Sequence, residues 1–166
     1  MLVIAGILNF RDEINEVNSP KEYCSWEEVE YLIIVLADKI IKKSNKKYDI
    51  ILGITNGGII PARLMARELN IDYIQFIPVR NKELQREEMP LLHKDKKYLV
   101  IDEIYDTGDT FSKVYDVVKV FDNDFAFLMS RYEQQYHHDI EAFVGKILNH
   151  NKWVVFPWES TKDYQY

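Results

Sequence analysis

Residues 98–110 read Tyr-Leu-Val-Ile-Asp-Glu-Ile-Tyr-Asp-Thr-Gly-Asp-Thr, and this stretch decides the fold. Its first four residues are apolar, a pattern that favours a strand buried on both faces of a sheet. Two acids follow directly, and a third stands just before a Thr-Gly turn. Apolar residues then recur at helical spacing from Phe111 to Val120. The sequence therefore predicts a strand, an acidic tip, a tight turn and a helix.

The chemistry of this stretch points to a phosphorylated sugar. Small and hydroxyl residues at 107–110 precede a helix, where free backbone N–H groups form a cradle for phosphate. Asp102 and Glu103 stand beside that cradle, where carboxylates suit ribose hydroxyls or a metal ion that bridges to a second phosphate. A P-loop ATPase is excluded because the chain contains no G-x-x-x-x-G-K-[ST] segment. A plain strand-to-helix turn with solvated acids stays open at this point.

Length and composition favour one soluble globular domain. The chain has 166 residues, of which 47% are hydrophobic and 29% charged. Its net charge of −6 argues against a nucleic-acid surface, and no apolar run approaches membrane-spanning length. The single cysteine, Cys24, rules out an internal disulfide, so we expect a cytoplasmic protein.

The remaining patterns predict alternating strands and helices, and hence a mostly parallel sheet flanked by helices. Ligands of such folds bind at the carboxyl ends of the strands. A polar segment at 80–96 is long enough to be a functional lid. The other predicted elements are an edge strand at Val3–Leu8, a helix capped by Ser25, a strand at Asp49–Ile54, a helix at Ile59–Leu69, and strands at Tyr73–Val79 and Phe125–Met129.

Residues 98–110 resemble the signature of type I phosphoribosyltransferases, in which an apolar strand and two acids precede Asp-Thr-Gly-x-Thr. The resemblance implies binding of phosphoribosyl pyrophosphate, with Asp106 as the catalytic residue. Glu103 departs from the family, which usually has a second aspartate there. Asp109 also departs, because it places a negative charge inside the phosphate loop; we expect its side chain to cap the helix and point away. The implied contacts in this stretch are Asp102, Glu103, Asp106, Thr107, Gly108, Asp109 and Thr110.

Residues 55–61 resemble the pyrophosphate loop of the xanthine-guanine branch, which reads Ser-Arg-Gly-Gly-Leu-x-Pro. Here Asn56 replaces the arginine and Gly57 keeps the first glycine, so a cation is missing. Residues 85–87 read Gln-Arg-Glu and resemble the lid of the same enzymes. Arg86 is therefore a candidate contact for the pyrophosphate.

Residues 143–145 and 152–159 resemble the base-binding end of purine phosphoribosyltransferases. The resemblance implies that Trp153 stacks on the base and that the backbone of Val154 reads its edge. Relatives place a lysine near Arg131 to donate to the base, and Arg131 is the nearest cation here. Glu159 matches an acid close to the metal, which gives Asp102, Glu103 and Glu159 as candidate Mg²⁺ ligands.

The resemblance as a whole implies a type I phosphoribosyltransferase fold with a small C-terminal hood. It implies a Mg²⁺-dependent transfer of the phosphoribosyl group to hypoxanthine, guanine or xanthine in purine salvage, by a homodimer or homotetramer. We expect an N-terminal extension at 1–22 and one domain at 23–166, with its core at about 23–130 and its hood at about 131–166. Two alternatives stay open: a regulator that binds phosphoribosyl pyrophosphate without turnover, and transfer to a non-purine base.

Overall fold

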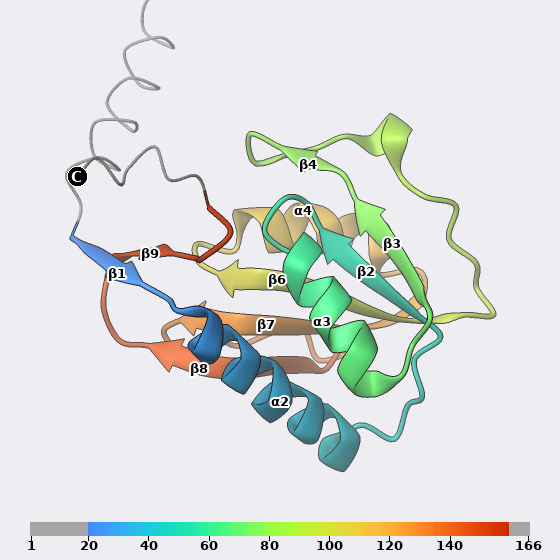
Figure 1. Cartoon of the computed structure of the whole chain (residues 1–166). Helices are drawn as coiled ribbons and strands as arrows, with labels where there is room; N and C mark the ends of the chain where they lie inside the picture. Colours follow the sequence, from blue (N-terminus) through green and yellow to red (C-terminus); the bar gives the residue numbers. More distant parts are fainter. Residues whose placement is uncertain (1–19, 160–166) are drawn as a thin grey trace, which may run out of the picture.

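The computed structural model describes residues 20–159, and it has the predicted α/β architecture (Figure 1). Five parallel strands form the central sheet in the order β3-β2-β6-β7-β8. The predicted edge strand at residues 3–8 lies outside the described part. The elements are β1 (Lys21–Tyr23), α2 (Trp26–Lys43), β2 (Ile50–Ile54), α3 (Ile59–Leu69), β3 (Tyr73–Ile77), β4 (Val79–Arg80), β5 (Glu83–Leu84), η1 (Arg86–Glu88), β6 (Lys97–Tyr105), α4 (Asp109–Val118), β7 (Asp122–Arg131), β8 (Ala142–Leu148) and β9 (Trp153–Val155).

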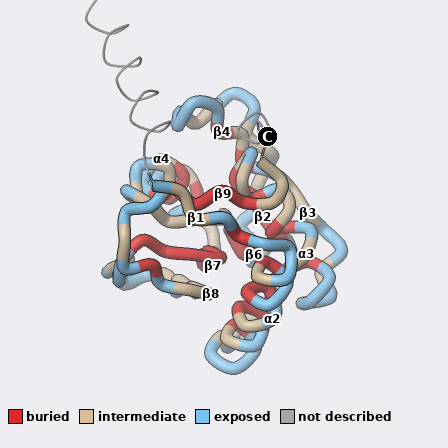
Figure 2. Tube along the Cα trace, turned by 60° about the vertical axis from the view of Figure 1, so that its left-hand side comes forward, coloured by how far each residue is buried: buried red, intermediate tan, exposed pale blue. Residues whose placement is uncertain are grey.

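Helices α2 and α3 cover one face of the sheet, and α4 covers the other (Figure 1). The predicted cap of α2 is confirmed, because the Ser25 hydroxyl accepts a hydrogen bond of 3.1 Å from the Glu28 backbone N–H. Each helix turns its apolar stripe toward the sheet, so the buried residues run through the strands and the inner helix faces (Figure 2).

Strand β6 is longer than predicted, because it runs on through the acidic residues to Tyr105. Strand β7 lies alongside it over this whole length, with Asp102 opposite Phe127 and Ile104 opposite Met129. The expectation of an acidic tip after residue 101 is therefore wrong. Ladder pairing with a long neighbouring strand overrides the low strand propensity of the two acids.

Two small sheets stand apart from the central one. Strand β1 pairs in parallel with β9, so residues from both ends of the described chain build the hood. It begins at Lys21, two residues before the predicted domain boundary. Strands β4 and β5 form an antiparallel hairpin within the segment that we predicted to be a lid. Both small sheets lie near the carboxyl ends of the central strands (Figure 1).

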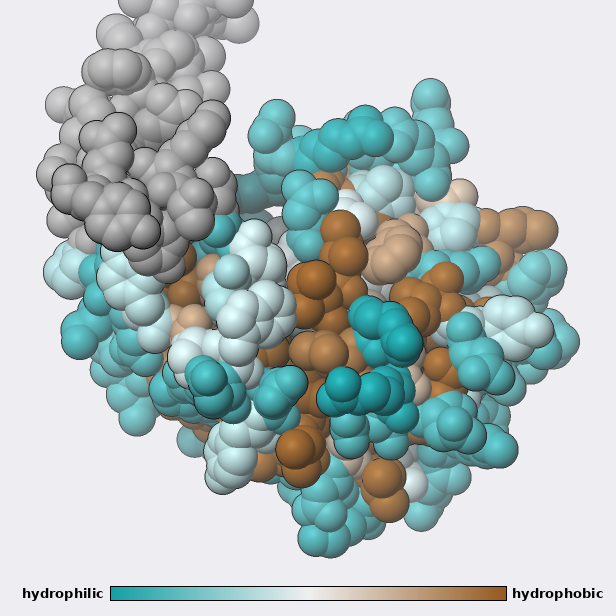
Figure 3. Space-filling view, viewed as in Figure 1, coloured by the Kyte–Doolittle hydropathy of each residue, from teal (hydrophilic) through white to brown (hydrophobic). Residues whose placement is uncertain are grey.

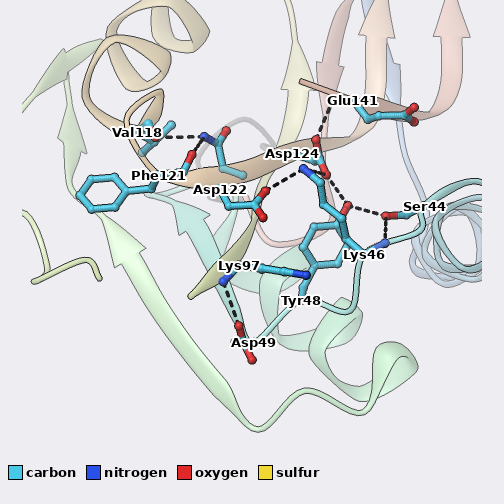
Figure 4. Close-up of polar contacts among 11 residues, drawn as sticks. Ser44, Lys46, Tyr48, Asp49, Lys97, Val118, Phe121, Asp122, Asp124 and Glu141 are labelled. Carbon is cyan, nitrogen blue, oxygen red and sulfur yellow. Dashed lines mark hydrogen bonds and ion pairs between the residues drawn. The ribbon is translucent and has the colours of Figure 1, made fainter. Parts of the chain in front are cut away.

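A buried polar network closes the opposite end of the sheet (Figure 4). Asp124 on β7 has 1% of its surface exposed, and its carboxylate accepts hydrogen bonds from the Tyr48 hydroxyl at 2.7 Å and the Glu141 backbone N–H at 2.7 Å. Lys46 makes an ion pair with the same carboxylate at 3.0 Å. These contacts join the α2–β2 connection to β7 and to the start of β8. They satisfy a charge that would be costly if it were buried alone.

The surface over α2 and α3 mixes polar side chains with single hydrophobic ones (Figure 3). Ile34 and Ile41 on α2 are 57% and 67% exposed, and Ile59 at the start of α3 is 38% exposed. Scattered apolar side chains of this kind are normal on soluble domains. No helix within residues 20–159 is both long and apolar enough to cross a membrane.

Candidate active site

A cavity of about 590 Å³ lies at the carboxyl ends of β2 and β6. Its walls come from residues 54–57, 79–82 and 102–111, together with Phe127 and Trp153. The structure thus brings together segments that are up to a hundred residues apart in sequence. All the predicted contacts for phosphoribosyl pyrophosphate line this cavity: Asn56, Gly57, Asp102, Glu103, Asp106, Thr107, Gly108, Asp109 and Thr110.

Residues 106–110, here called the phosphate turn, lead into the first turn of α4. Gly108 is the N-cap residue and has φ of 89°, a left-handed conformation that residues with a side chain rarely adopt. A Cβ at this position would also lie 2.5 Å from the Tyr105 hydroxyl oxygen. Glycine therefore lets the backbone turn tightly and leaves the first N–H groups of α4 facing the cavity end of the helix.

The expectation that Asp109 caps this helix is wrong. The N-cap is Gly108, which makes no side-chain cap hydrogen bond, and Asp109 is the first residue of α4. Its side chain is exposed and lines the cavity, so solvent screens its charge. The positive end of the helix dipole also favours an acid at this position.

The carboxyl groups of Asp102 and Glu103, which line the cavity, both have raised pKa values. Burial raises the pKa of Glu103 to about 7, with a further contribution from the negative charge of Glu159. The Trp158 indole N–H donates to Glu103 Oε2 at 3.0 Å and partly opposes this rise. Burial, followed by the charge of Glu103, also raises the pKa of Asp102 well above its usual range. A cation bound between phosphate and these acids would relieve both effects.

We expect Glu103→Gln to stabilise the ligand-free protein at pH 8 but not near pH 5. A carboxyl whose pKa rises on folding destabilises the native state once it ionises, so stability falls as the pH rises from about 4.5 to about 7. The gain at pH 8 should be on the order of 1–3 kcal/mol. Thermal unfolding across this pH range measures it, with the exposed Glu87→Gln as control. A difference independent of pH would contradict the assignment.

The loop at 55–58 lies beside these acids. Its Thr55–Asn56 peptide bond is cis, and Asn56 is exposed at the cavity wall. A Cβ on Gly57 would collide with the Glu103 carboxylate, and one on Gly58 would lie 2.5 Å from the Ile101 carbonyl oxygen. The two glycines therefore let the loop pack directly against β6.

The cations that line the cavity come from the β4–β5 hairpin. They are Arg80 and Lys82, which the sequence reading missed. Asn81 and Lys82 have φ of 51° and 61°, the positive values of a two-residue hairpin turn. The signal that could have located this turn is Asn81, a common turn residue, between the apolar residues Val79 and Leu84.

The hairpin is docked on α4. The Lys113 ammonium donates to the Lys82 carbonyl oxygen at 2.8 Å and to Glu83 Oε1 at 2.6 Å. Arg80 makes a two-bond contact with Glu88, whereas the Lys82 ammonium makes no ion pair within residues 20–159. Lys82 is therefore the cavity cation that is available to an anionic ligand.

Arg86 and Glu159 do not line the cavity. Arg86 is exposed on η1, just beyond the hairpin, and its role as a pyrophosphate contact stays a prediction. Glu159 Oε2 accepts a hydrogen bond of 2.7 Å from the Phe156 backbone N–H. Its charge still acts on the cavity, because it raises the pKa of Glu103.

The two adjacent residues predicted to bind the base, Trp153 and Val154, have side chains in different surroundings. Trp153 lines the cavity, whereas the Val154 side chain is buried in the core. The Trp153 N–H donates to the Pro20 carbonyl oxygen, and the Val155 carbonyl accepts from the Cys24 N–H, so both residues bond toward β1. Backbone groups of adjacent strand residues point to opposite edges, so those of Val154 face away from β1. This edge is available to read a base, as the resemblance implies.

Arg131 lies outside the cavity lining. It is the last residue of β7, and its Nε donates to Asp106 Oδ1 at 2.5 Å. Because the Arg131 side chain does not line the cavity, the structure gives no support to its predicted role as a donor to the base. The sequence reading placed both residues in the site but did not foresee that they pair with each other.

Known proteins resemble this chain in sequence and in fold. The chain is 26% identical over 148 residues to a xanthine-guanine phosphoribosyltransferase of Nitratidesulfovibrio vulgaris, a match covering 84% of this chain and 85% of that protein. It is 29% identical over 147 residues to a xanthine-guanine phosphoribosyltransferase of Desulfotalea psychrophila, covering 84% and 87%. The fold matches that of a purine phosphoribosyltransferase from Pyrococcus horikoshii with a TM-score of 0.67 at 29% identity, covering 84% and 94%. The family model of the phosphoribosyl transferase domain matches residues 19–165. The chain therefore belongs to the phosphoribosyltransferase family.

Proposed function

We propose that this protein transfers the phosphoribosyl group of phosphoribosyl pyrophosphate to a 6-oxopurine base, namely hypoxanthine, guanine or xanthine, and releases pyrophosphate in purine salvage. One observation carries the proposal: the phosphate turn at 106–110, the two acids on β6 and the ring of Trp153 line the same cavity. The names of the similar proteins support the choice of a purine.

The cavity assigns a role to each end of the substrate. The backbone N–H groups of the turn bind the 5′-phosphate, and the acids of β6 hold the ribose hydroxyls. Trp153 stacks on the purine, and the Val154 backbone aligns its edge. Displacement at the anomeric carbon builds positive charge on the ribose, while Asp106 accepts the proton that the attacking purine releases. Asp106 suits this role because its side chain is 41% exposed and lines the cavity.

The donor set fits Mg²⁺ that arrives with the substrate. No group of three or more His, Cys, Asp and Glu side chains within residues 20–159 is arranged to hold a metal ion by itself. Mg²⁺ commonly binds through one or two carboxylates plus substrate phosphates, and Asp102 and Glu103 supply such a pair. Both carboxyls have raised pKa values because they are buried close to other negative charges, and a bound cation would offset this effect. When bound, the ion neutralises the charge of the leaving pyrophosphate.

A spectrophotometric panel of bases with phosphoribosyl pyrophosphate and Mg²⁺ tests the proposal. We expect turnover of at least one of hypoxanthine, guanine and xanthine, and none of orotate or uracil. Turnover of a pyrimidine instead would favour the non-purine alternative. The proposal includes a cytoplasmic location and a homodimer or homotetramer. Cell fractionation tests the location, and light scattering tests the oligomeric state.

A second candidate is a regulator that binds phosphoribosyl pyrophosphate without turnover. Two features favour it: Asn56 stands in place of a cation, and the Arg131 guanidinium is engaged with Asp106 instead of facing the cavity. Calorimetric binding of phosphoribosyl pyrophosphate by a protein inactive on every base would establish this function and exclude the first.

Asn56→Arg should tighten the binding of phosphoribosyl pyrophosphate by about 1 kcal/mol, or roughly 5-fold. A hydrogen bond between two charged groups is about twice as strong as one with a neutral donor. Because position 56 is exposed, the gain should shrink with added salt. Calorimetry at low and high salt measures both effects. Unchanged affinity would contradict a pyrophosphate contact at this loop, and would leave that role to Lys82.

A further inference from the structure

Arg131 connects the two halves of the cavity. Its Nε donates to Asp106 Oδ1, and its Nη1 donates to the carbonyl oxygens of His150 at 2.7 Å and Lys152 at 3.1 Å. One guanidinium therefore spans from the phosphate turn to the loop that leads directly into Trp153.

That loop is held from its other sides as well. The His150 ring accepts a hydrogen bond from the Lys152 backbone N–H at 3.2 Å through Nδ1, and its Nε2 lies 2.6 Å from Glu22 Oε2 on β1. The Tyr132 hydroxyl donates to Asn151 Oδ1 at 2.7 Å. These contacts tie the loop to the hood and to the end of β7, and Arg131 ties it to Asp106.

The burial of Arg131 makes this arrangement specific. Its side chain is 11% exposed, and a buried cation is tolerated only when its donors are satisfied. Here a carboxylate accepts from Nε and two carbonyl oxygens accept from Nη1 at fixed directions, which suits the planar fork of a guanidinium and not the single ammonium of a lysine. Asp106 meanwhile stays 41% exposed on the cavity side.

We propose that Arg131 is a positioning residue for the transfer reaction, which fixes the Asp106 carboxylate relative to the ring of Trp153. This inference rests on the proposed function. The purine is held by Trp153 and must present its N–H to Asp106, so a displacement of either residue separates the proton from its acceptor. Because proton transfer and attack need close alignment, a shift of about 1 Å can cost up to 10²-fold in rate.

Arg131→Lys and Arg131→Gln test this role, with Arg67→Gln on the surface of α3 as the matched control. We expect both Arg131 variants to lose roughly 10- to 100-fold in kcat and to have a raised KM for the base. The calorimetric Kd and stoichiometry for phosphoribosyl pyrophosphate with Mg²⁺ should stay within about 2-fold of wild type, because Arg131 does not line the cavity. In an Asp106→Asn background, Arg131→Lys should cost much less, because the two residues act as one unit.

Two outcomes would overturn the inference. If Arg131→Lys keeps the wild-type kcat and changes only the preferred base, the side chain is a donor to the base. If both variants lose binding sites for phosphoribosyl pyrophosphate in proportion to activity, and unfold at lower temperature, the residue is merely structural. Failure of the proposed function looks different: the wild type itself would turn over no purine base and bind no purine nucleoside monophosphate in calorimetry, and the inference would fall with it.

Discussion

Asp106→Asn should lower kcat by about 10²–10³-fold while the fold survives. The amide keeps the size of the side chain but cannot accept the proton of the attacking purine, and positioned general acid–base groups contribute on this scale. The side chain is 41% exposed, and the amide oxygen of asparagine can still accept the hydrogen bond from the buried Arg131 Nε, so the fold should survive. Steady-state kinetics with the preferred base, together with calorimetry for phosphoribosyl pyrophosphate, measures the effect.

Asp116→Asn is the matched control for this substitution. Asp116 is exposed on α4 and pairs with Lys119 at 2.8 Å, a surface contact of little energetic weight. It should keep the wild-type kcat. Wild-type turnover by Asp106→Asn would show that another group accepts the proton, and would remove the main chemical role of the phosphate turn.

The sequence predicted the central part of the fold because its signals are local. The apolar run at 98–101, the Ser25 cap and the helix at Ile59–Leu69 depend on neighbouring residues, and the structure confirms them. The turn at Gly108 before α4 was predictable for the same reason, since a glycine turn before a helix determines its own geometry.

Three features that the sequence did not predict depend on contacts between distant segments. Strand β6 extends through its acids because β7 pairs with it, and no local pattern in β6 reports the length of β7. Lys82 reaches the cavity because Lys113, thirty-one residues away, docks the hairpin on α4. The pairing of Arg131 with Asp106 spans twenty-five residues and depends on the parallel register of β6 and β7.

Trp153→Ala should raise the KM for the base by roughly 5- to 150-fold, with a much smaller effect on the KM for phosphoribosyl pyrophosphate. Stacking of a base on an aromatic ring is worth about 1–3 kcal/mol, and alanine removes it. The ring is only partly buried and lines the cavity, so its loss should not unfold the protein.

Trp153→Phe separates stacking from packing, because phenylalanine keeps an aromatic face in the same strand position. We expect it to recover most of the base affinity, and both variants should unfold close to the wild-type temperature, because the Trp153 N–H that bonds to Pro20 belongs to the backbone. Equal increases in both KM values, accompanied by a lower unfolding temperature, would instead show that Trp153 packs the hood against the sheet. The base would then have to be held by the Val154 backbone and by another aromatic residue that lines the cavity, such as Phe127.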